Sequence, residues 1–156
     1  QRWGEPLATP PLPGLERLFP TPTALAQADL RETGLTTTRA ATISTMAQAL
    51  LDGRVDFSAE QSLDTFVARW IALPGIGAWT AHYIAMRALG DPDAFPAADL
   101  ILRREAAPDA APLGTKALNE RANAWRPWRA YAVIHLWRGA SEAPAPARQK
   151  KPEAIA

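Results

Sequence analysis

The chain has 156 residues, a formal net charge of +1 and 47% apolar residues, which suits one domain that buries a core without help from disulfides. Cysteine is absent, which excludes disulfides, cysteine nucleophiles, thiolate zinc sites and cysteine-ligated iron–sulfur clusters. No apolar run has the length of a membrane span and no secretory signal pattern opens the chain, so we expect a cytoplasmic protein with no membrane partner.

The chain opens with an arm and a first helix. Residues 1–14 are rich in proline and small residues, which predicts an extended arm. Thr21 followed by Pro22 predicts a helix start, because Thr caps well and Pro suits the first helical position. This short helix should run to about Ala28.

Two longer helices are predicted next. Apolar residues at helical spacing predict a helix over 36–52, which Gly53 ends. Ser58 with Gln61 predicts a capping box for the following helix. The apolar face of that helix includes Leu63, Phe66, Val67, Trp70 and Ile71.

A tight hairpin should join this helix to the next one. The residues Leu73-Pro74-Gly75-Ile76-Gly77 cannot continue a helix, because Gly supplies unusual backbone angles and Pro lacks a donor. A helix over 78–89 follows, closed by Gly90. Its first backbone N–H groups have no partner within the helix and lie at the positive end of its dipole, an arrangement that suits a phosphate oxygen. The hairpin therefore predicts contact with a nucleic-acid backbone independent of base sequence.

The last third of the chain predicts three more helices. One begins near Pro96, one is capped by Thr115 and runs into Trp125, and one opens at Pro127 and ends at Gly139. The tail over 140–156 is basic, rich in proline and poor in apolar residues, so we expect disorder. No alternating strand pattern appears, and the fold class is all-α.

Three blocks resemble the helix-hairpin-helix DNA glycosylases, and within that superfamily the 3-methyladenine DNA glycosylase II type. The first is Phe19-Pro20-Thr21-Pro22, the second runs from Leu73 to Asp99, and the third runs from Trp125 to Trp137. The resemblance implies a glycosylase domain over 15–139. Only residues 1–18 precede the first block, whereas the family has further helices there and, in this subfamily, a β-rich domain. We therefore expect those parts to be missing or to belong to another polypeptide.

The resemblance also implies roles for particular residues. Asp99 would be the catalytic carboxylate, and Trp79, Tyr83 and Trp137 would form the pocket for the excised base. The hairpin would bind the DNA backbone through N–H groups of Gly75, Gly77 and Trp79, with a hydroxyl contact from Thr80. A monovalent cation, as in family hairpins, would be held by the carbonyl oxygens of Ile71, Leu73 and Ile76; no other cofactor is expected.

The chemistry of these residue types suits removal of an alkylated base. A carboxylate stabilises the positive charge that develops on deoxyribose as an N-glycosidic bond breaks. Alkylated purines are cationic and are attracted to aromatic faces. Strand-cutting relatives place a lysine where this chain has Trp79, and no lysine occurs between Gly53 and Thr115. Water should then be the nucleophile, which predicts a monofunctional enzyme. The resemblance further implies a monomer that acts on damaged duplex DNA in bacterial base excision repair, at the nucleoid.

Each of these assignments has a plainer alternative. Asp99 could only cap a helix, since Asp is a favoured cap. Trp79, Tyr83 and Trp137 could be core residues, which is how we interpret Trp70 and Trp128. The segment 100–138 carries seven basic and three acidic residues, a net charge of +4, which fits a DNA-facing surface or an ordinary solvated one. The whole chain could accordingly be a non-catalytic DNA-binding module, an inactive fragment, or a helical interaction domain.

Overall fold

The structure is a computed structural model that describes residues 2–10, 12–107 and 110–142. Within this part the chain forms helices, and its sole β-type pairing is an isolated bridge between Pro6 and Arg17, so the predicted all-α class is confirmed. No helix in the described ranges has the length and apolar character needed to cross a bilayer.

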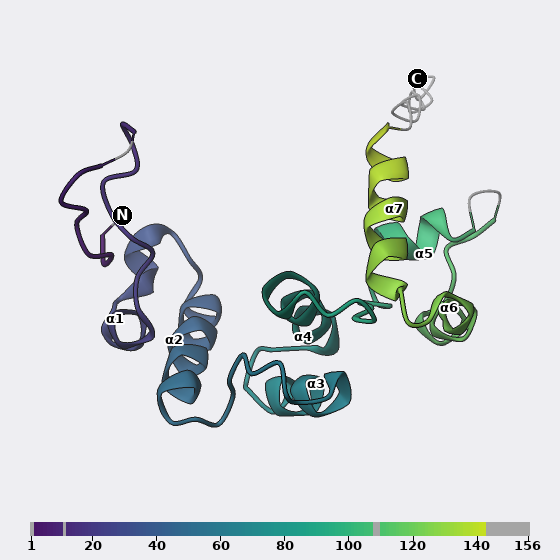
Figure 1. Ribbon diagram of the computed structural model, residues 1–156, viewed down its shortest axis with the longest axis horizontal. Helices are drawn as coiled ribbons and strands as arrows, with labels where there is room; N and C mark the ends of the chain where they lie inside the picture. The colour runs from purple at the N-terminus through teal and green to yellow at the C-terminus, as the bar shows by residue number, and fades with distance from the viewer. Residues whose placement is uncertain (1, 11, 108–109, 143–156) are drawn as a thin grey trace, which may run out of the picture.

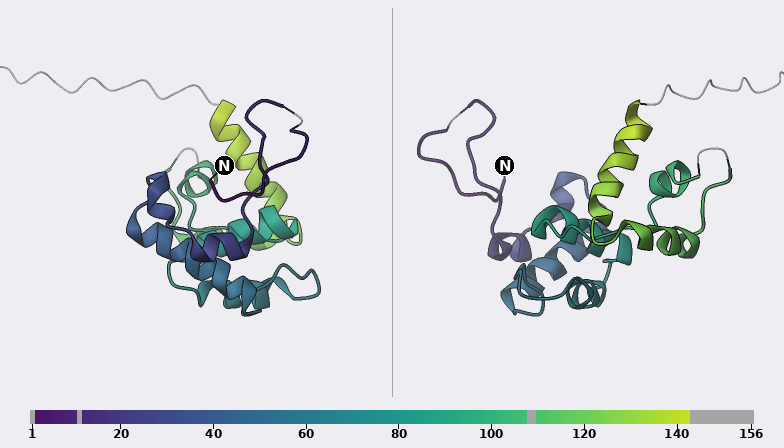
Figure 2. Two further views of the ribbon diagram at one scale, coloured as in Figure 1. Left: turned by 90° about the vertical axis from the view of Figure 1, so that its left-hand side faces the viewer. Right: turned by 45° about the vertical axis from the view of Figure 1, so that its right-hand side comes forward.

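The helices follow one another along a curved arrangement. In chain order they are α1 (Pro22–Gln27), the 3₁₀ turn η1 (Leu30–Thr33), α2 (Thr37–Leu51), α3 (Leu63–Ile71), α4 (Ala78–Ile84), the π-helical turn η2 (Ala85–Leu89), α5 (Leu100–Glu105), α6 (Thr115–Ala122), the 3₁₀ turn η3 (Asn123–Trp125) and α7 (Arg129–Glu142). Figure 1 shows α1 beside α2 at one end, α3 beside α4 in the middle, and α5, α6 and α7 at the other end. The N-terminal arm loops away from the start of α1 (Figure 2).

Buried apolar side chains form one cluster that extends from α2 to α7. Trp70 is fully buried in it and stacks on Phe66 with ring centroids 5.2 Å apart, which confirms that Trp70 is a core residue. The prediction that Trp128 is also a core residue is wrong, because Trp128 is 58% exposed. Among the described residues, its ring contact is a T-shaped one with the exposed Tyr131. Trp128 precedes α7, so the helical spacing that would have turned it inward does not apply to it.

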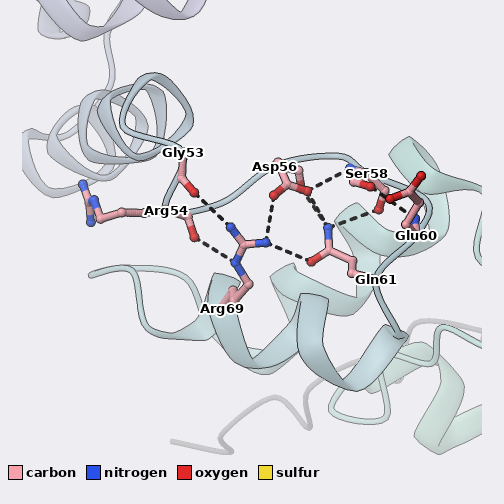
Figure 3. A network of polar contacts seen from close by, with 7 residues as sticks. All are labelled: Gly53, Arg54, Asp56, Ser58, Glu60, Gln61 and Arg69. Carbon is pink, nitrogen blue, oxygen red and sulfur yellow. Dashed lines mark hydrogen bonds and ion pairs between the residues drawn. The ribbon is translucent and has the colours of Figure 1, made fainter.

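The connection from α2 to α3 is held by one arginine (Figure 3). The Arg69 side chain donates to the carbonyl oxygens of Gly53 and Arg54 at 3.0 and 2.9 Å and to the Asp56 carboxylate at 2.8 Å. Gln61 donates to Asp56 at 2.7 Å from the other side. The loop is therefore tied to α3, the helix that leads into the hairpin.

Several helix boundaries differ from the sequence prediction. Ser62, not Ser58, caps α3, because the Ser62 hydroxyl accepts the N–H of Thr65 while Gln61 is engaged by Asp56. The helix expected near Pro96 begins later, at Leu100. The last helix starts at Arg129 rather than Pro127.

Two further boundaries depend on glycines. Gly114 takes the cap position of α6, so Thr115 is its first residue instead of its cap. Gly139 lies inside α7, which continues to Glu142, where Arg138 and Glu142 form an ion pair one turn apart. A glycine in a helix interior costs only about 1 kcal/mol, which neighbouring contacts offset. Of the predicted tail, residues 143–156 lie outside the described residues.

Candidate active site

The predicted hairpin lies between α3 and α4. Gly75 has a φ of +85°, a left-handed conformation that favours glycine. Gly77 occupies the cap position of α4 with extended backbone and no capping side chain. The N–H groups of Ala78, Trp79 and Thr80 belong to the first helical turn, so they have no acceptor within the helix. Ala78 and Trp79 are exposed and Thr80 is half-buried, so the start of α4 lies at the surface.

Asp99 lies at the start of α5 and accepts four hydrogen bonds. The backbone N–H groups of Ile101 and Leu102 donate to Oδ1, each at 3.0 Å, so Asp99 does cap the helix. The indole Nε1 of Trp137 also donates to Oδ1, at 3.1 Å. The indole Nε1 of Trp79 donates to Oδ2 at 3.0 Å. The cap is thus also the meeting point of the hairpin helix, α5 and α7.

These contacts keep the Asp99 carboxyl ionised. Partial burial raises the pKa of Asp99, but the hydrogen bonds from Leu102, Trp137, Trp79 and Ile101 lower it, and the net pKa lies below the usual value for Asp. A carboxylate that is fully charged at neutral pH can stabilise positive charge on a neighbouring group.

The aromatic residues named from the sequence lie around this carboxylate. The Trp79 and Tyr83 rings stack with centroids 5.2 Å apart and an interplanar angle of 8°, and the Tyr83 and Trp137 rings are 6.1 Å apart. Trp79 is 38% exposed and Tyr83 is 37% exposed, so neither is a core residue. Trp137 is half-buried and packs against the core cluster while its N–H reaches Asp99. The structure therefore brings Asp99, Trp79, Tyr83 and Trp137 into one group.

The remaining predicted residues lie along the hairpin. Ile71 is the last residue of α3, Leu73 and Ile76 are buried, and Thr80 is half-buried on α4. The Leu73 carbonyl oxygen accepts the N–H of Ile76 at 3.1 Å, which leaves one of its two lone pairs for another partner. Neutral carbonyl donors suit a cation of low charge. In the described part of the chain no three His, Cys, Asp or Glu side chains are placed to hold a metal ion.

The excess of basic residues over 100–138 has a largely structural role. The Arg103 side chain donates to the Leu113 carbonyl oxygen, and that of Arg121 to the Ala106 carbonyl oxygen. Arg126 and Arg129 both pair with Asp93. Most of this positive charge therefore stabilises the fold, and the charge count alone did not indicate a binding surface.

Sequence reasoning missed the two indole donors to Asp99 and the pairing of Asp93 with Arg129. The direction of an indole N–H depends on rotamers and on helix packing, for which a sequence offers no local signal. The Asp93 and Arg129 pair spans 36 residues of chain. The sequence signal for this ion pair was Arg129, a charged residue beside apolar residues in the block from Trp125 to Trp137.

No protein-family model matches the chain. It is 42% identical over 123 residues to the "Probable bifunctional transcriptional activator/DNA repair enzyme AlkA" of Mycobacterium tuberculosis, which covers 79% of this chain and 25% of that protein. It is 34% identical over 122 residues to DNA-3-methyladenine glycosylase 2 of Escherichia coli, which covers 76% of this chain and 42% of that protein. The chain spans less than half the length of these relatives.

A solved structure shows the same fold. The 3-methyladenine DNA glycosylase of Schizosaccharomyces pombe in complex with abasic DNA superposes with a TM-score of 0.74 at 23% identity, over 80% of this chain and 65% of the other. Together with the hairpin, these likenesses confirm the predicted resemblance to the helix-hairpin-helix DNA glycosylase superfamily. Within that superfamily it is similar to the AlkA-type 3-methyladenine DNA glycosylases.

Proposed function

We propose that this chain contains the catalytic part of a monofunctional DNA glycosylase, which hydrolyses the N-glycosidic bond of alkylated, cationic purines such as 3-methyladenine in duplex DNA. The observation that carries the proposal is the Asp99 carboxylate, whose two oxygens accept hydrogen bonds from the indoles of Trp79 and Trp137, beside the exposed rings of Trp79 and Tyr83. The similarity to glycosylases of this name supports the same reaction class. Such an enzyme acts on chromosomal DNA, which places it in the cytoplasm at the nucleoid.

The reaction needs little beyond these residues. A base extruded from the duplex stacks on the rings of Trp79, Tyr83 and Trp137, and these rings bind a cationic base more tightly than a neutral one. As the bond to the base breaks, positive charge develops on the deoxyribose, and the Asp99 carboxylate stabilises it. An alkylated base leaves without strong protonation because it already carries positive charge.

Water is the nucleophile in this proposal. An amine nucleophile would have to come from a lysine, and the chain has none between Gly53 and Thr115. The position that a lysine occupies in strand-cutting relatives is Trp79 here. The product is then an intact strand with an abasic site.

In the same proposal, the hairpin binds the DNA backbone. Backbone N–H groups at Gly75, Gly77 and Trp79, with the Thr80 hydroxyl, bind phosphate oxygens without reading sequence. The solved complex of the yeast relative with abasic DNA supports DNA as the partner. A monovalent cation on the carbonyl oxygens of Ile71, Leu73 and Ile76 fits their neutral donor chemistry and would fix the hairpin for this contact.

The variant Asp99→Asn tests the catalytic assignment. It keeps a residue that caps helices well but removes the negative charge, so we expect release of free base from methylated duplex DNA to fall at least about 100-fold, since electrostatic stabilisation is a large part of catalysis. Duplex binding, measured by fluorescence anisotropy, should persist. Asp64→Asn, at an exposed carboxylate in the first turn of α3, is the matched control and should leave release unchanged. Full turnover by Asp99→Asn would remove Asp99 from the mechanism.

A further inference from the structure

The four hydrogen bonds to Asp99 are shared unequally between its two carboxylate oxygens. Oδ1 accepts from Ile101, Leu102 and Trp137, whereas Oδ2 accepts from Trp79 alone. A carboxylate oxygen has about two lone pairs. Oδ1 is therefore fully engaged, and Oδ2 keeps a lone pair for another partner.

Helix capping does not account for this arrangement. The side chains that cap α1, α2 and α3 each serve the backbone with one hydroxyl, as when Ser62 accepts the N–H of Thr65 at the start of α3. Asp99 needs only its bonds to Ile101 and Leu102 for that purpose. The two indole donors are additional, and they come from two different helices.

The two indoles also differ in their surroundings. Trp137 is half-buried and packs against the core cluster, so its N–H approaches Asp99 from the interior of the molecule. Trp79 is 38% exposed and follows the hairpin directly, so its N–H approaches from the accessible side. Oδ2 is thus the oxygen nearer to a ligand that binds at the exposed rings of Trp79 and Tyr83.

We propose that Trp137 is a positioning residue which, with the first turn of α5, fixes Oδ1, and that Oδ2 is the oxygen presented to the deoxyribose of the extruded nucleotide. The inference rests on the proposed function, because it assigns a role within that reaction. Three donors on Oδ1 fix the plane of the carboxylate without help from Trp79. Trp79 then contributes its ring to the base pocket and an N–H that an incoming substrate replaces on Oδ2.

Two substitutions separate these roles. Trp137→Phe and Trp79→Phe each keep an aromatic ring and remove one N–H donor. Trp128→Phe is the matched control, because Trp128 is an exposed tryptophan whose N–H makes no bond to Asp99. If Trp137→Phe unfolds, benzothienylalanine at position 137 replaces the N–H by sulfur and keeps the shape of the indole.

The first measurement does not depend on activity. The pKa of the Asp99 carboxyl, followed by carbon-13 NMR in the free chain, should rise in both Trp137→Phe and Trp79→Phe and stay unchanged in Trp128→Phe, because each of the first two loses a hydrogen bond to the charged form. The second measurement is base release from methylated duplex DNA under single-turnover conditions with saturating protein. We expect a loss of roughly tenfold or more for Trp137→Phe and less than about threefold for Trp79→Phe.

The outcomes separately test the positioning role of Trp137, the assignment of the two carboxylate oxygens and the proposed function. An unchanged pKa of Asp99 in the variant at position 137 would overturn its positioning role. A larger loss of rate at position 79 than at position 137 would overturn the assignment of the two oxygens. If the pKa values move as expected but the wild-type chain releases no base, the positioning by Trp137 holds and the proposed function, with the role of Oδ2 in it, fails.

Discussion

Gly75 and Gly77 are two residues apart in the hairpin, but the structure requires glycine at only one of them. A Cβ atom on Gly75 would lie 2.0 Å from the Thr42 hydroxyl oxygen on α2, and the φ of +85° would strain any other residue. A Cβ atom on Gly77 would meet nothing within 4 Å, and the backbone there is extended. The fold itself therefore does not require glycine at position 77.

Gly77→Ala separates DNA contact from folding. We expect its free energy of unfolding to stay within about 0.5 kcal/mol of wild type, as for an unstrained surface change. The added methyl group obstructs a phosphate that approaches the first turn of α4, so affinity for duplex DNA should fall roughly tenfold, or about 1.4 kcal/mol. Gly114→Ala is the control, because Gly114 also caps a helix without close neighbours. Equal affinity of Gly77→Ala and Gly114→Ala for duplex DNA would contradict contact between the hairpin backbone and phosphate.

The residue types of the site could be read from the sequence, but their contacts could not. Asp99, Trp79, Tyr83 and Trp137 were named through the resemblance, and the structure brings them together. The sequence also offered capping as the alternative for Asp99, and the structure shows that Asp99 caps α5 while it accepts two indole donors. One residue can thus cap a helix and also supply the negative charge of the candidate site. The sequence analysis had treated these two roles of Asp99 as alternatives.

At the scale of elements, helices were predicted better than their first residues. The 3.6-residue periodicity located α2, α3 and the α4 helix with its η2 extension, because these helices bury one face each. The start of α3 was misplaced because Ser58 and Ser62 both have local signals for a cap. Long-range contacts decide between them: Arg69 and Gln61 hold Asp56 and with it the loop that contains Ser58.

Arg69→Ala tests that loop contact. Loss of the bonds to Gly53, Arg54 and Asp56 should lower the free energy of unfolding by about 1–2 kcal/mol, since Arg69 is only partly buried. Arg39→Ala, at an exposed arginine on α2, is the control for loss of a surface charge and should change stability little.

The cost of Arg69→Ala should also depend on pH. The pKa of Asp56 is lowered by its hydrogen bonds from the Ser58 N–H, Arg69 and Gln61. A depressed pKa stabilises the folded state above the unfolded pKa, and this stability is lost as the pH falls through the folded value. Denaturant unfolding should therefore show the gap between wild type and Arg69→Ala narrowing below about pH 4, because the bond to Asp56 weakens while those to the Gly53 and Arg54 carbonyl oxygens remain. A gap of constant size from pH 7 to pH 3 would contradict the account.

At the scale of the whole molecule, one ion pair connects the segment before α5 to α7. The Arg129 guanidinium donates twice to the Asp93 carboxylate, at 2.7 and 2.9 Å, and lies over the Phe95 ring. The N–H of Ala130 donates to the Pro92 carbonyl oxygen at 2.8 Å. These contacts set the position of Trp137 on α7 relative to Asp99 on α5. The basic excess seen in the sequence is explained in part by this structural role.

Asp93→Asn should destabilise the whole fold. Arg129 is only 6% exposed, so removal of its partner leaves a buried unpaired charge, which costs about 3–5 kcal/mol. Arg126→Ala removes the exposed partner of the same carboxylate and should cost less than about 1 kcal/mol. Thermal unfolding of the two variants measures the difference. Similar midpoints for both would show that Arg129 does not depend on Asp93.

In the proposed reaction, the charged Asp99 carboxylate beside the aromatic rings of Trp79, Tyr83 and Trp137 promotes removal of a damaged base by hydrolysis. The most direct measurement incubates the full chain with duplex DNA that contains methylated purines, and then follows free base and strand length, with and without borohydride. We expect released methylated base, an uncut strand with an abasic site, and no covalent protein–DNA adduct. No released base, or an adduct trapped by borohydride, would contradict the proposed reaction.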